Sequence, residues 1–246
     1  MCPEGIGPTL NPGPDTMTST LAIMYLWLHT HAAGAPRVTA SVPLISSSLA
    51  RLGPLVEREL PLWVELWRKR VPSFAVSSFT PVREGPFTPE YTVEFTPSED
   101  EDIRRRLYAC APDRSLCVDP YVLTSFERQA DRIESLSDAD QGVALIDMKK
   151  KTWTRLLFCG TGCSFQDAAW LDGDTLAIVG STDEPTNADA PCTQNGSCPA
   201  SATATIIDLK NRRVRTFRGP GSSEAVATDE YLARRLSALG LRPLRD

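Results

Sequence analysis

Histidine is nearly absent from this chain. Among its 246 residues there are two histidines, His29 and His31, and both lie close to the N-terminus. Ser-His-Asp and Cys-His mechanisms need a histidine base, so the rest of the chain cannot build one from its own residues. The sequence also has no glycine-rich phosphate loop. The segment Gly160-Thr161-Gly162 lacks the following lysine and helix, and we interpret it as a constrained turn.

The chain also has no excess of positive charge. The 26 Lys and Arg residues are outnumbered by 31 Asp and Glu, which gives a net charge of -5. Binding to nucleic-acid phosphates needs a basic footprint, so the composition argues against a nucleic-acid partner. The basic clusters at 104–106, 149–151 and 212–213 are typical of solvated turns. The apolar fraction of 41% is typical of a globular chain.

No apolar run is long enough to span a bilayer. The run Leu21–Leu28 has the length of a signal-peptide core. Small residues follow it, and Val38-Thr39-Ala40 before Ser41 has the form of a cleavage site, although no Lys or Arg precedes Arg37 to form a basic start. We expect residues 1–40 to be a leader, disordered or signal-like. The mature chain is then exported to the periplasm, the cell envelope or the medium.

The seven cysteines support the same location. Six of them form three close pairs, Cys110 with Cys117, Cys159 with Cys163, and Cys192 with Cys198. A hairpin turn at 112–115 places Cys110 directly opposite Cys117, near the separation that a disulfide requires. A zinc site is the alternative, but these spacings fit no zinc knuckle or ribbon. Three local disulfides indicate an oxidising compartment.

A segment of about 60 residues occurs twice, which indicates a repeat architecture. The run at 144–149 returns at 205–210, and each copy continues through a basic turn into a second apolar run. The match extends backwards, where 108–118 aligns with 168–178. Each copy reads as four antiparallel strands around one long polar loop, Asp119–Gln141 in the first copy and Gly180–Ser201 in the second.

These strands predict a mainly β fold with two four-stranded antiparallel, blade-like sheets in a β-repeat domain at 73–221. Strands that are apolar on both faces, such as the one at 143–148, must bury both faces against other layers of the fold. The alternating run Tyr91–Phe95 lies about one period before Trp153, so it is interpreted as the remnant of an earlier copy.

The order of apolar residues, an Asp, a short basic turn and a following strand resembles a blade of the β-propeller repeat proteins, and so does the segment Trp170–Gly180. The resemblance covers residues 107–218. Closed propellers have about 4 to 8 blades, more than this chain supplies. Three interpretations follow: a propeller fragment, a ring completed by oligomerisation, or a sandwich of two sheets.

Helices are expected on both sides of the β region. Residues 41–72 have apolar positions at helical spacing, and Pro61 is expected to kink or restart the helix. Trp63 and Trp67 share one face, which favours packing over a membrane-surface or partner site. The pattern at 98–101 has the capping-box form and predicts a short helical turn before Arg104. A C-terminal helix within 222–246 ends near Gly240 and is expected to cover an apolar surface or a sheet edge.

The remaining candidates for chemistry are carboxylates. Asp172, Asp174, Asp183 and Asp189 lie in and beside one predicted hairpin, so they are candidate calcium ligands. Surface turns use Asp for ordinary reasons, and turn chemistry is the favoured interpretation. Paired acids of a hydrolase are the third interpretation. The sequence assigns no catalytic or cofactor-binding residue, and calcium is the one cofactor it suggests.

The favoured hypothesis is a non-catalytic, exported β-repeat protein that binds a protein or glycan partner or serves as an envelope scaffold. A carboxylate- or metal-dependent hydrolase is the first alternative. A truncated fragment of a larger propeller protein, without independent function, is the second.

Overall fold

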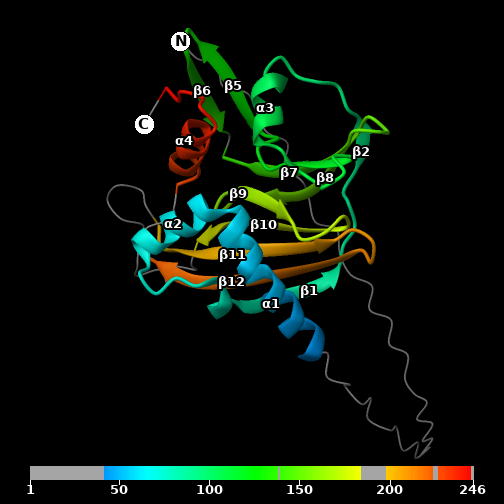
Figure 1. The fold of residues 1–246 in the computed structure, drawn as a ribbon, viewed down its shortest axis with the longest axis vertical. Helices are drawn as coiled ribbons and strands as arrows, with labels where there is room; N and C mark the ends of the chain where they lie inside the picture. The colour runs from blue at the N-terminus through cyan, green and yellow to red at the C-terminus, as the bar shows by residue number, and fades with distance from the viewer. Residues whose placement is uncertain (1–41, 138, 184–197, 224–226, 245–246) are drawn as a thin grey trace, which may run out of the picture. The chain divides into compact units, whose positions relative to one another are not determined.

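The computed structural model describes residues 42–137, 139–183, 198–223 and 227–244, with side chains from Leu49 onward. The predicted leader at 1–40 lies outside these residues. Antiparallel sheets dominate the described part, and helices flank them (Figure 1). The predicted mainly β fold with flanking helices is therefore confirmed.

Sheet A has five strands in the order β1-β12-β11-β10-β9. Their bounds are β1 Thr80–Pro86, β9 Cys163–Trp170, β10 Thr175–Asp183, β11 Ala200–Asp208 and β12 Arg213–Ser222. The second copy of the repeat supplies the four consecutive strands β9 to β12. The edge strand β1 comes from the segment before the repeat.

Sheet B also has five strands, in the order β2-β8-β7-β4-β3. Their bounds are β2 Thr92–Glu94, β3 Ala109–Cys110, β4 Leu116–Asp119, β7 Gln141–Asp147 and β8 Thr152–Cys159. The first copy supplies β3, β4, β7 and β8 in the predicted order. The short strand β2 pairs with β8 and places Val93 opposite Trp153.

The predicted pair of four-stranded sheets is wrong, because each sheet gains an outer strand and a third sheet is present. Strand β1 contains Pro81 and Pro86 and shows no alternation of buried and exposed residues. These prolines are tolerated because β1 lies at the edge of the sheet, where one side of the strand needs no ladder hydrogen bonds. The third sheet is the hairpin of β5 (Thr124–Gln129) and β6 (Arg132–Ser137), inside the segment predicted as a long polar loop.

One face of sheet A packs against one face of sheet B. The shared cluster contains Val118 and Val143 from sheet B and Leu176, Ile178 and Ile207 from sheet A. This arrangement matches the sandwich among the three interpretations. The resemblance to propeller blades stays a prediction, because packed four-stranded meanders occur in both architectures.

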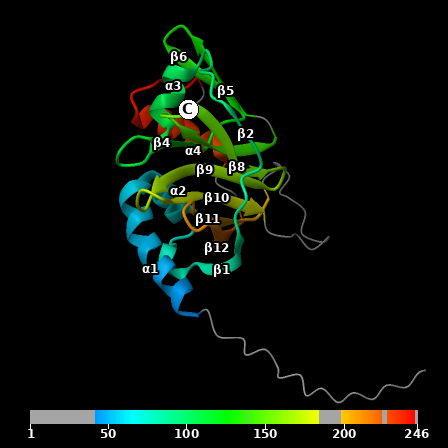
Figure 2. The same cartoon turned by 90° about the vertical axis from the view of Figure 1, so that its right-hand side faces the viewer.

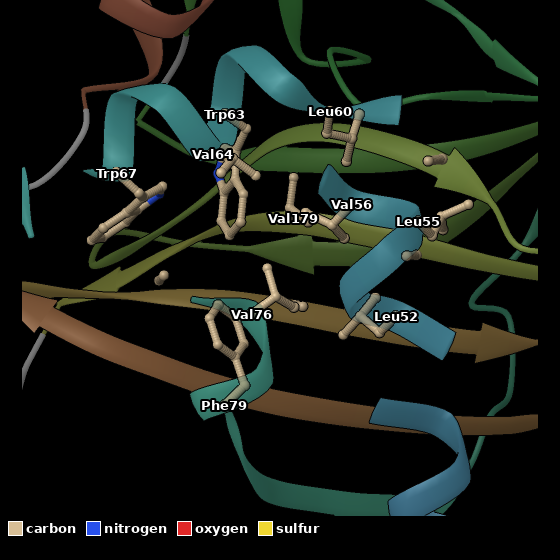
Figure 3. Close-up of a cluster of buried hydrophobic side chains, with 14 of the residues drawn as sticks. Leu52, Leu55, Val56, Leu60, Trp63, Val64, Trp67, Val76, Phe79 and Val179 are labelled. Carbon is tan, nitrogen blue, oxygen red and sulfur yellow. The ribbon is translucent and has the colours of Figure 1, made fainter. Parts of the chain in front are cut away.

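Two helices cover the other face of sheet A, so this sheet buries both of its faces. Helix α1 spans Val42–Glu59 and α2 spans Pro61–Arg70, and α1 crosses in front of β11 and β12 in Figure 1 and lies beside them in Figure 2. Pro61 occupies the first turn of α2, where its missing N–H is tolerated. Trp63 and Trp67 are fully buried (Figure 3), so their shared face is core.

A third apolar cluster joins the β5–β6 hairpin to two short helices, α3 (Glu101–Leu107) and α4 (Thr228–Ala238). Helix α3 begins after Asp100 and continues beyond Arg104, and Ser98 does not cap its backbone. The predicted turn is therefore placed too early and is too short. Helix α4 contacts both α2 and β9, as expected of a C-terminal helix that covers an apolar surface.

The turns of the two copies share their local chemistry. Asp147 accepts hydrogen bonds from the backbone N–H groups of Lys149 and Lys150, and Asp208 accepts one from that of Asn211. Lys151 and Arg212 then adopt positive φ angles of 53° and 50° at corresponding places. These aspartates hold tight turns and thus have a structural role.

Two of the three predicted cysteine pairs are bonded in the structure. Cys110 lies directly opposite Cys117 in the β3–β4 ladder and is bonded to it, and Cys159 is bonded to Cys163 across the β8–β9 turn. Cys198 is disulfide-bonded too. Its predicted partner, Cys192, lies outside the described residues.

Candidate functional site

A cavity opens on the face of sheet B that points away from sheet A. Its volume is about 400 Å³, and it lies between α3, the β2 segment and the outer sides of β7 and β8. Leu145 packs into the core shared by the two sheets, whereas its neighbour Ile146 lines the cavity. Strand alternation thus gives sheet B one buried face and one face that is free to form a site.

The cavity combines aromatic walls with acidic groups. Four aromatic side chains and three carboxylates line it, with Arg104 at its base. The aromatic residues are Tyr91, Phe95, Tyr108 and Trp153, and the carboxylates are Glu94, Glu101 and Asp119. A concave surface with apolar walls and a few convergent polar groups is the usual form of a ligand site.

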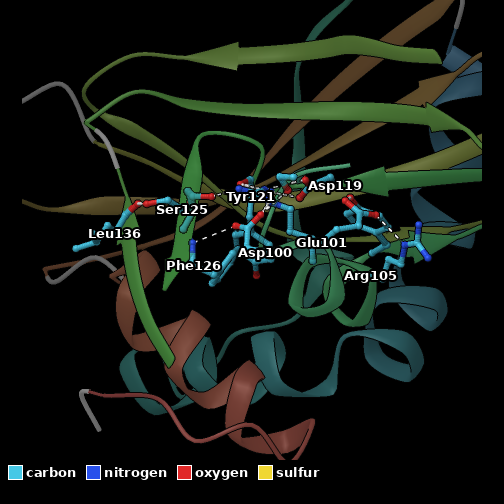
Figure 4. Close-up of polar contacts among 12 residues, drawn as sticks. Asp100, Glu101, Arg105, Asp119, Tyr121, Ser125, Phe126 and Leu136 are labelled. Atoms are coloured by element: carbon cyan, nitrogen blue, oxygen red, sulfur yellow. Dashed lines mark hydrogen bonds and ion pairs between the residues drawn. The ribbon is translucent and has the colours of Figure 1, made fainter. Parts of the chain in front are cut away.

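Arg104 organises the inner end of the cavity. Its Nε donates to Asp100 Oδ1 over 2.8 Å, and its NH1 donates to Asp119 Oδ2 over 3.1 Å and to the carbonyl oxygen of Tyr121 over 2.9 Å. A further bond reaches the Thr124 carbonyl oxygen. Figure 4 shows this group of contacts between α3 and the chain that follows β4. The arginine thereby fixes α3 against the β4–β5 connection.

Asp119 is the carboxylate most changed by its surroundings. Its side chain is almost fully buried, and this burial raises its pKa to about 6. The guanidinium of Arg104 and the backbone N–H of Tyr121 act in the opposite direction. Their effect is smaller than that of burial. At neutral pH Asp119 is therefore mostly ionised, although it takes up a proton far more readily than an exposed aspartate.

Glu101 forms the second acidic group of the cavity. It is 7% exposed, and it accepts hydrogen bonds from Arg105 Nε over 2.9 Å and from the Tyr108 hydroxyl over 3.1 Å. Burial and the charges of Asp119 and Glu101 raise the pKa of Tyr108 well above its ordinary value. Tyr108 is thus held as a neutral hydrogen-bond donor beside the cavity.

An aromatic surface leads from the cavity along β8. The rings of Tyr91 and Trp153 lie 5.4 Å apart between centroids, and the guanidinium of Arg155 lies 4.8 Å from the Tyr91 ring and 4.9 Å from the Phe158 ring. Glu90 accepts a hydrogen bond from Arg155 Nε over 2.5 Å. Tyr91 is 43% exposed and Phe158 45% exposed. Such exposed rings, held in place by neighbours, can stack on a ligand without a large loss of side-chain freedom.

A third buried carboxylate lies apart from the cavity. Asp167 on β9 accepts a hydrogen bond from the Tyr231 hydroxyl on α4 and lies 3.2 Å from Arg235 Nε. Burial raises the pKa of Asp167, against the opposing effects of Arg235 and Tyr231. The neighbouring Gln166 accepts a hydrogen bond from Trp63 Nε1 over 2.8 Å. These contacts tie α4 and α2 to β9, so we interpret Asp167 as structural.

Three of the four predicted calcium ligands lie at the two ends of β10. Asp172 and Asp174 lie in the β9–β10 turn, where Asp172 Oδ2 is 3.0 Å from Arg51 NH2. Asp183 ends β10, roughly 30 Å from Asp174 at the usual rise of a strand. The structure therefore does not bring Asp183 together with the other two. Asp189 lies outside the described residues, and the calcium site stays a prediction.

Most of the cavity was not predicted from the sequence. The sequence pattern predicts a polar loop that begins at Asp119 and a helical turn that includes Glu101. The alternating run at 91–95 does predict a strand there, and this strand, β2, pairs with β8 at the edge of sheet B. Nothing in the sequence indicates that Arg104 joins Asp100 and Asp119.

Within the described ranges, no group of three or more His, Cys, Asp or Glu side chains is arranged to hold a metal ion. In the same part of the chain, none of the helices combines the length and the apolar character needed to cross a membrane. Comparison of the chain with known protein families, with curated proteins and with solved structures finds no match.

Proposed function

We propose that this protein is a non-catalytic binding module whose ligand site is the cavity on the outer face of sheet B. The observation that carries the proposal is the cavity itself, about 400 Å³ in volume and lined by aromatic rings and carboxylates. This volume falls within the roughly 300–1,000 Å³ range of ligand pockets. It suits a small molecule, one sugar ring of a glycan, or one side chain of a protein partner.

The bonding of the two buried acids supports binding rather than catalysis. Asp119 accepts hydrogen bonds from Arg104 and Tyr121, and Glu101 accepts them from Arg105 and Tyr108. Both carboxylates also line the cavity, where acceptors in fixed positions can orient a ligand. A general acid or base must instead exchange a proton with its substrate at close range.

The disulfides support an exported location. Cys110–Cys117 and Cys159–Cys163 are both local bridges, and such bonds persist in oxidising compartments. We propose that the module acts in the periplasm, the cell envelope or the medium. The same proposal includes a role as an envelope scaffold and assembly with further copies of this chain.

One observation favours the hydrolase alternative. The pKa of Asp119, raised to about 6 by burial, lies in the range that suits a general acid near neutral pH. Turnover of a glycoside or peptide that Asp119→Asn abolishes, with the fold preserved, would establish the hydrolase and exclude a purely binding role.

The binding proposal is tested by nuclear magnetic resonance on the isotopically labelled, oxidised protein. Sugars, amino acids and small amines are added separately, and the side-chain signals of Tyr91 and Trp153 are followed. We expect at least one class of ligand to shift these signals. Tyr91→Ala should weaken that binding, and Phe158→Ala is the matched control, because Phe158 is equally exposed and also contacts Arg155 but does not line the cavity.

A further inference from the structure

The carboxylates of the cavity outnumber the cations that neutralise them. Glu101 and Asp119 line the cavity, and together with the adjacent Asp100 they share the two guanidinium groups of Arg104 and Arg105. Arg105 is more than half exposed, so solvent screens much of its charge. The inner end of the cavity therefore keeps an excess of negative charge at neutral pH.

Glu94 adds to this excess at the outer end. It lines the cavity from β2 and has no ion-pair partner among the described residues. The nearby Arg155 does not compensate it, because Arg155 is bound to Glu90. A ligand with a negative charge would meet a net repulsion in the cavity, and a neutral ligand would leave the excess unbalanced.

The aromatic walls select among positively charged ligands. Arg155 lies over the Tyr91 ring at 4.8 Å, so this ring already takes part in one contact with a cation. Tyr91 and Trp153 present two such rings at the cavity. Weakly hydrated organic cations, whose carbon substituents pack on aromatic rings, fit these walls better than a bare metal ion does.

We infer that the cavity binds an organic ammonium group, with its carbon substituents against Tyr91 and Trp153 and its charge toward Glu94, Glu101 and Asp119. This inference rests on the proposed binding function and names its ligand class. A free choline-like compound and the methylated lysine of a protein partner share this chemistry.

The test compares choline with its uncharged isostere 3,3-dimethylbutan-1-ol on the oxidised full chain, by titration calorimetry and by the same nuclear magnetic resonance signals. We expect choline to bind about 5- to 30-fold more tightly than the isostere, the range typical of one cation–aromatic interaction. An N-acetylated trimethyllysine amide is titrated in parallel, and the tighter of the two cations identifies the source.

Two pairs of variants locate the site. Glu94→Gln should weaken choline binding by about 2- to 5-fold, whereas Glu99→Gln, an exposed glutamate of the same segment outside the cavity, should leave it unchanged. Tyr91→Ala should weaken it by about 5-fold or more, and Phe158→Ala should not. All four positions are exposed, so these variants are expected to fold.

The outcomes separate the inference from the function on which it rests. Equal affinity for choline and its isostere, or binding of a neutral sugar alone at Tyr91 and Trp153, overturns the ammonium inference and leaves the binding function standing. If none of these ligands shifts the cavity signals, both are overturned. Choline binding that Glu94→Gln and Glu99→Gln change equally also contradicts the proposed site.

Discussion

Tyr231, in the last helix of the chain, donates a hydrogen bond from its hydroxyl to the buried carboxylate of Asp167, 64 residues earlier in the sequence. Arg235, one turn further along α4, lies 3.2 Å from the same carboxylate. Two side chains of one helix therefore satisfy one buried charge of β9. This contact fastens the C-terminal helix to sheet A.

We predict that Tyr231→Phe destabilises the protein by about 1–3 kcal/mol, because the variant removes a donor from a buried carboxylate. The measurement is urea unfolding of the oxidised protein. Tyr91→Phe is the control, since Tyr91 is exposed, and it should change the free energy of unfolding by less than about 0.5 kcal/mol. Equal stability of the two variants would show that the Tyr231 hydroxyl contributes nothing to holding α4.

The pH dependence of stability should reveal the burial of Asp119. Its pKa rises from 3.8 to about 6 on folding, mainly through burial, so the folded state binds the proton more tightly than the unfolded state does. Its contribution to stability is fully present below about pH 4 and is lost as the pH rises through about 6. The loss is on the order of 3 kcal/mol.

The measurement is the difference in unfolding free energy between the wild type and Asp119→Asn at pH 4 and at pH 7.5. This difference should shift in favour of the variant at the higher pH. Asp113→Asn is a control of opposite sign, because hydrogen bonds from Ser115 lower the pKa of the exposed Asp113. A difference for Asp119→Asn that stays flat, or that grows in favour of the wild type at high pH, would contradict the burial effect.

Gly180→Ala should be severely destabilising, by at least about 3 kcal/mol. A Cβ at this position would lie 1.8 Å from the carbonyl oxygen of Ser164 on the paired strand β9, so the backbone would have to move. Gly85→Ala in the edge strand β1 is the matched control, because a Cβ there meets no atom within 4 Å. Thermal unfolding of the two variants checks this, and similar melting temperatures would refute the close approach at Gly180.

Alkylation of the native protein should leave Cys110, Cys117, Cys159 and Cys163 unlabelled until a reductant is added. Peptide mapping by mass spectrometry is the measurement. The double variant Cys110→Ser with Cys117→Ser should lose about 2–3 kcal/mol of stability in the chain-entropy description of a short loop. Labelling of these four thiols before reduction would remove the main support for an exported location.

The hairpin of Cys110 and Cys117 was predictable because a short turn fixes the register of its two strands. The same local reasoning placed β7 and β8 of the first copy, but it missed β5 and β6. In the second copy the β9–β10 turn is one residue shorter, and Trp170 pairs with Leu176. The alignment of two diverged copies does not resolve a one-residue difference in the length of this turn.

Contacts between segments that are far apart in the chain could not be predicted from the sequence. The predicted polar loop begins at Gly180, yet β10 continues to Asp183, because Gly180 allows the close approach of β9. Strand β1 has no strand-like pattern, and its partner β12 alone determines its conformation. The cavity depends on Arg104 reaching Asp119, a contact that a reading of local patterns cannot supply.

Strand β1 pairs with β12, and its Thr80 lies opposite Arg218, 138 residues later in the chain. All of sheet B is encoded between these two partners. The first strand of sheet A must therefore wait for the last one to emerge during synthesis, and sheet B can form in the meantime. Such distant pairing slows folding, because a long loop must close before its contacts form. The closure of the β1–β12 edge therefore belongs to the late part of folding.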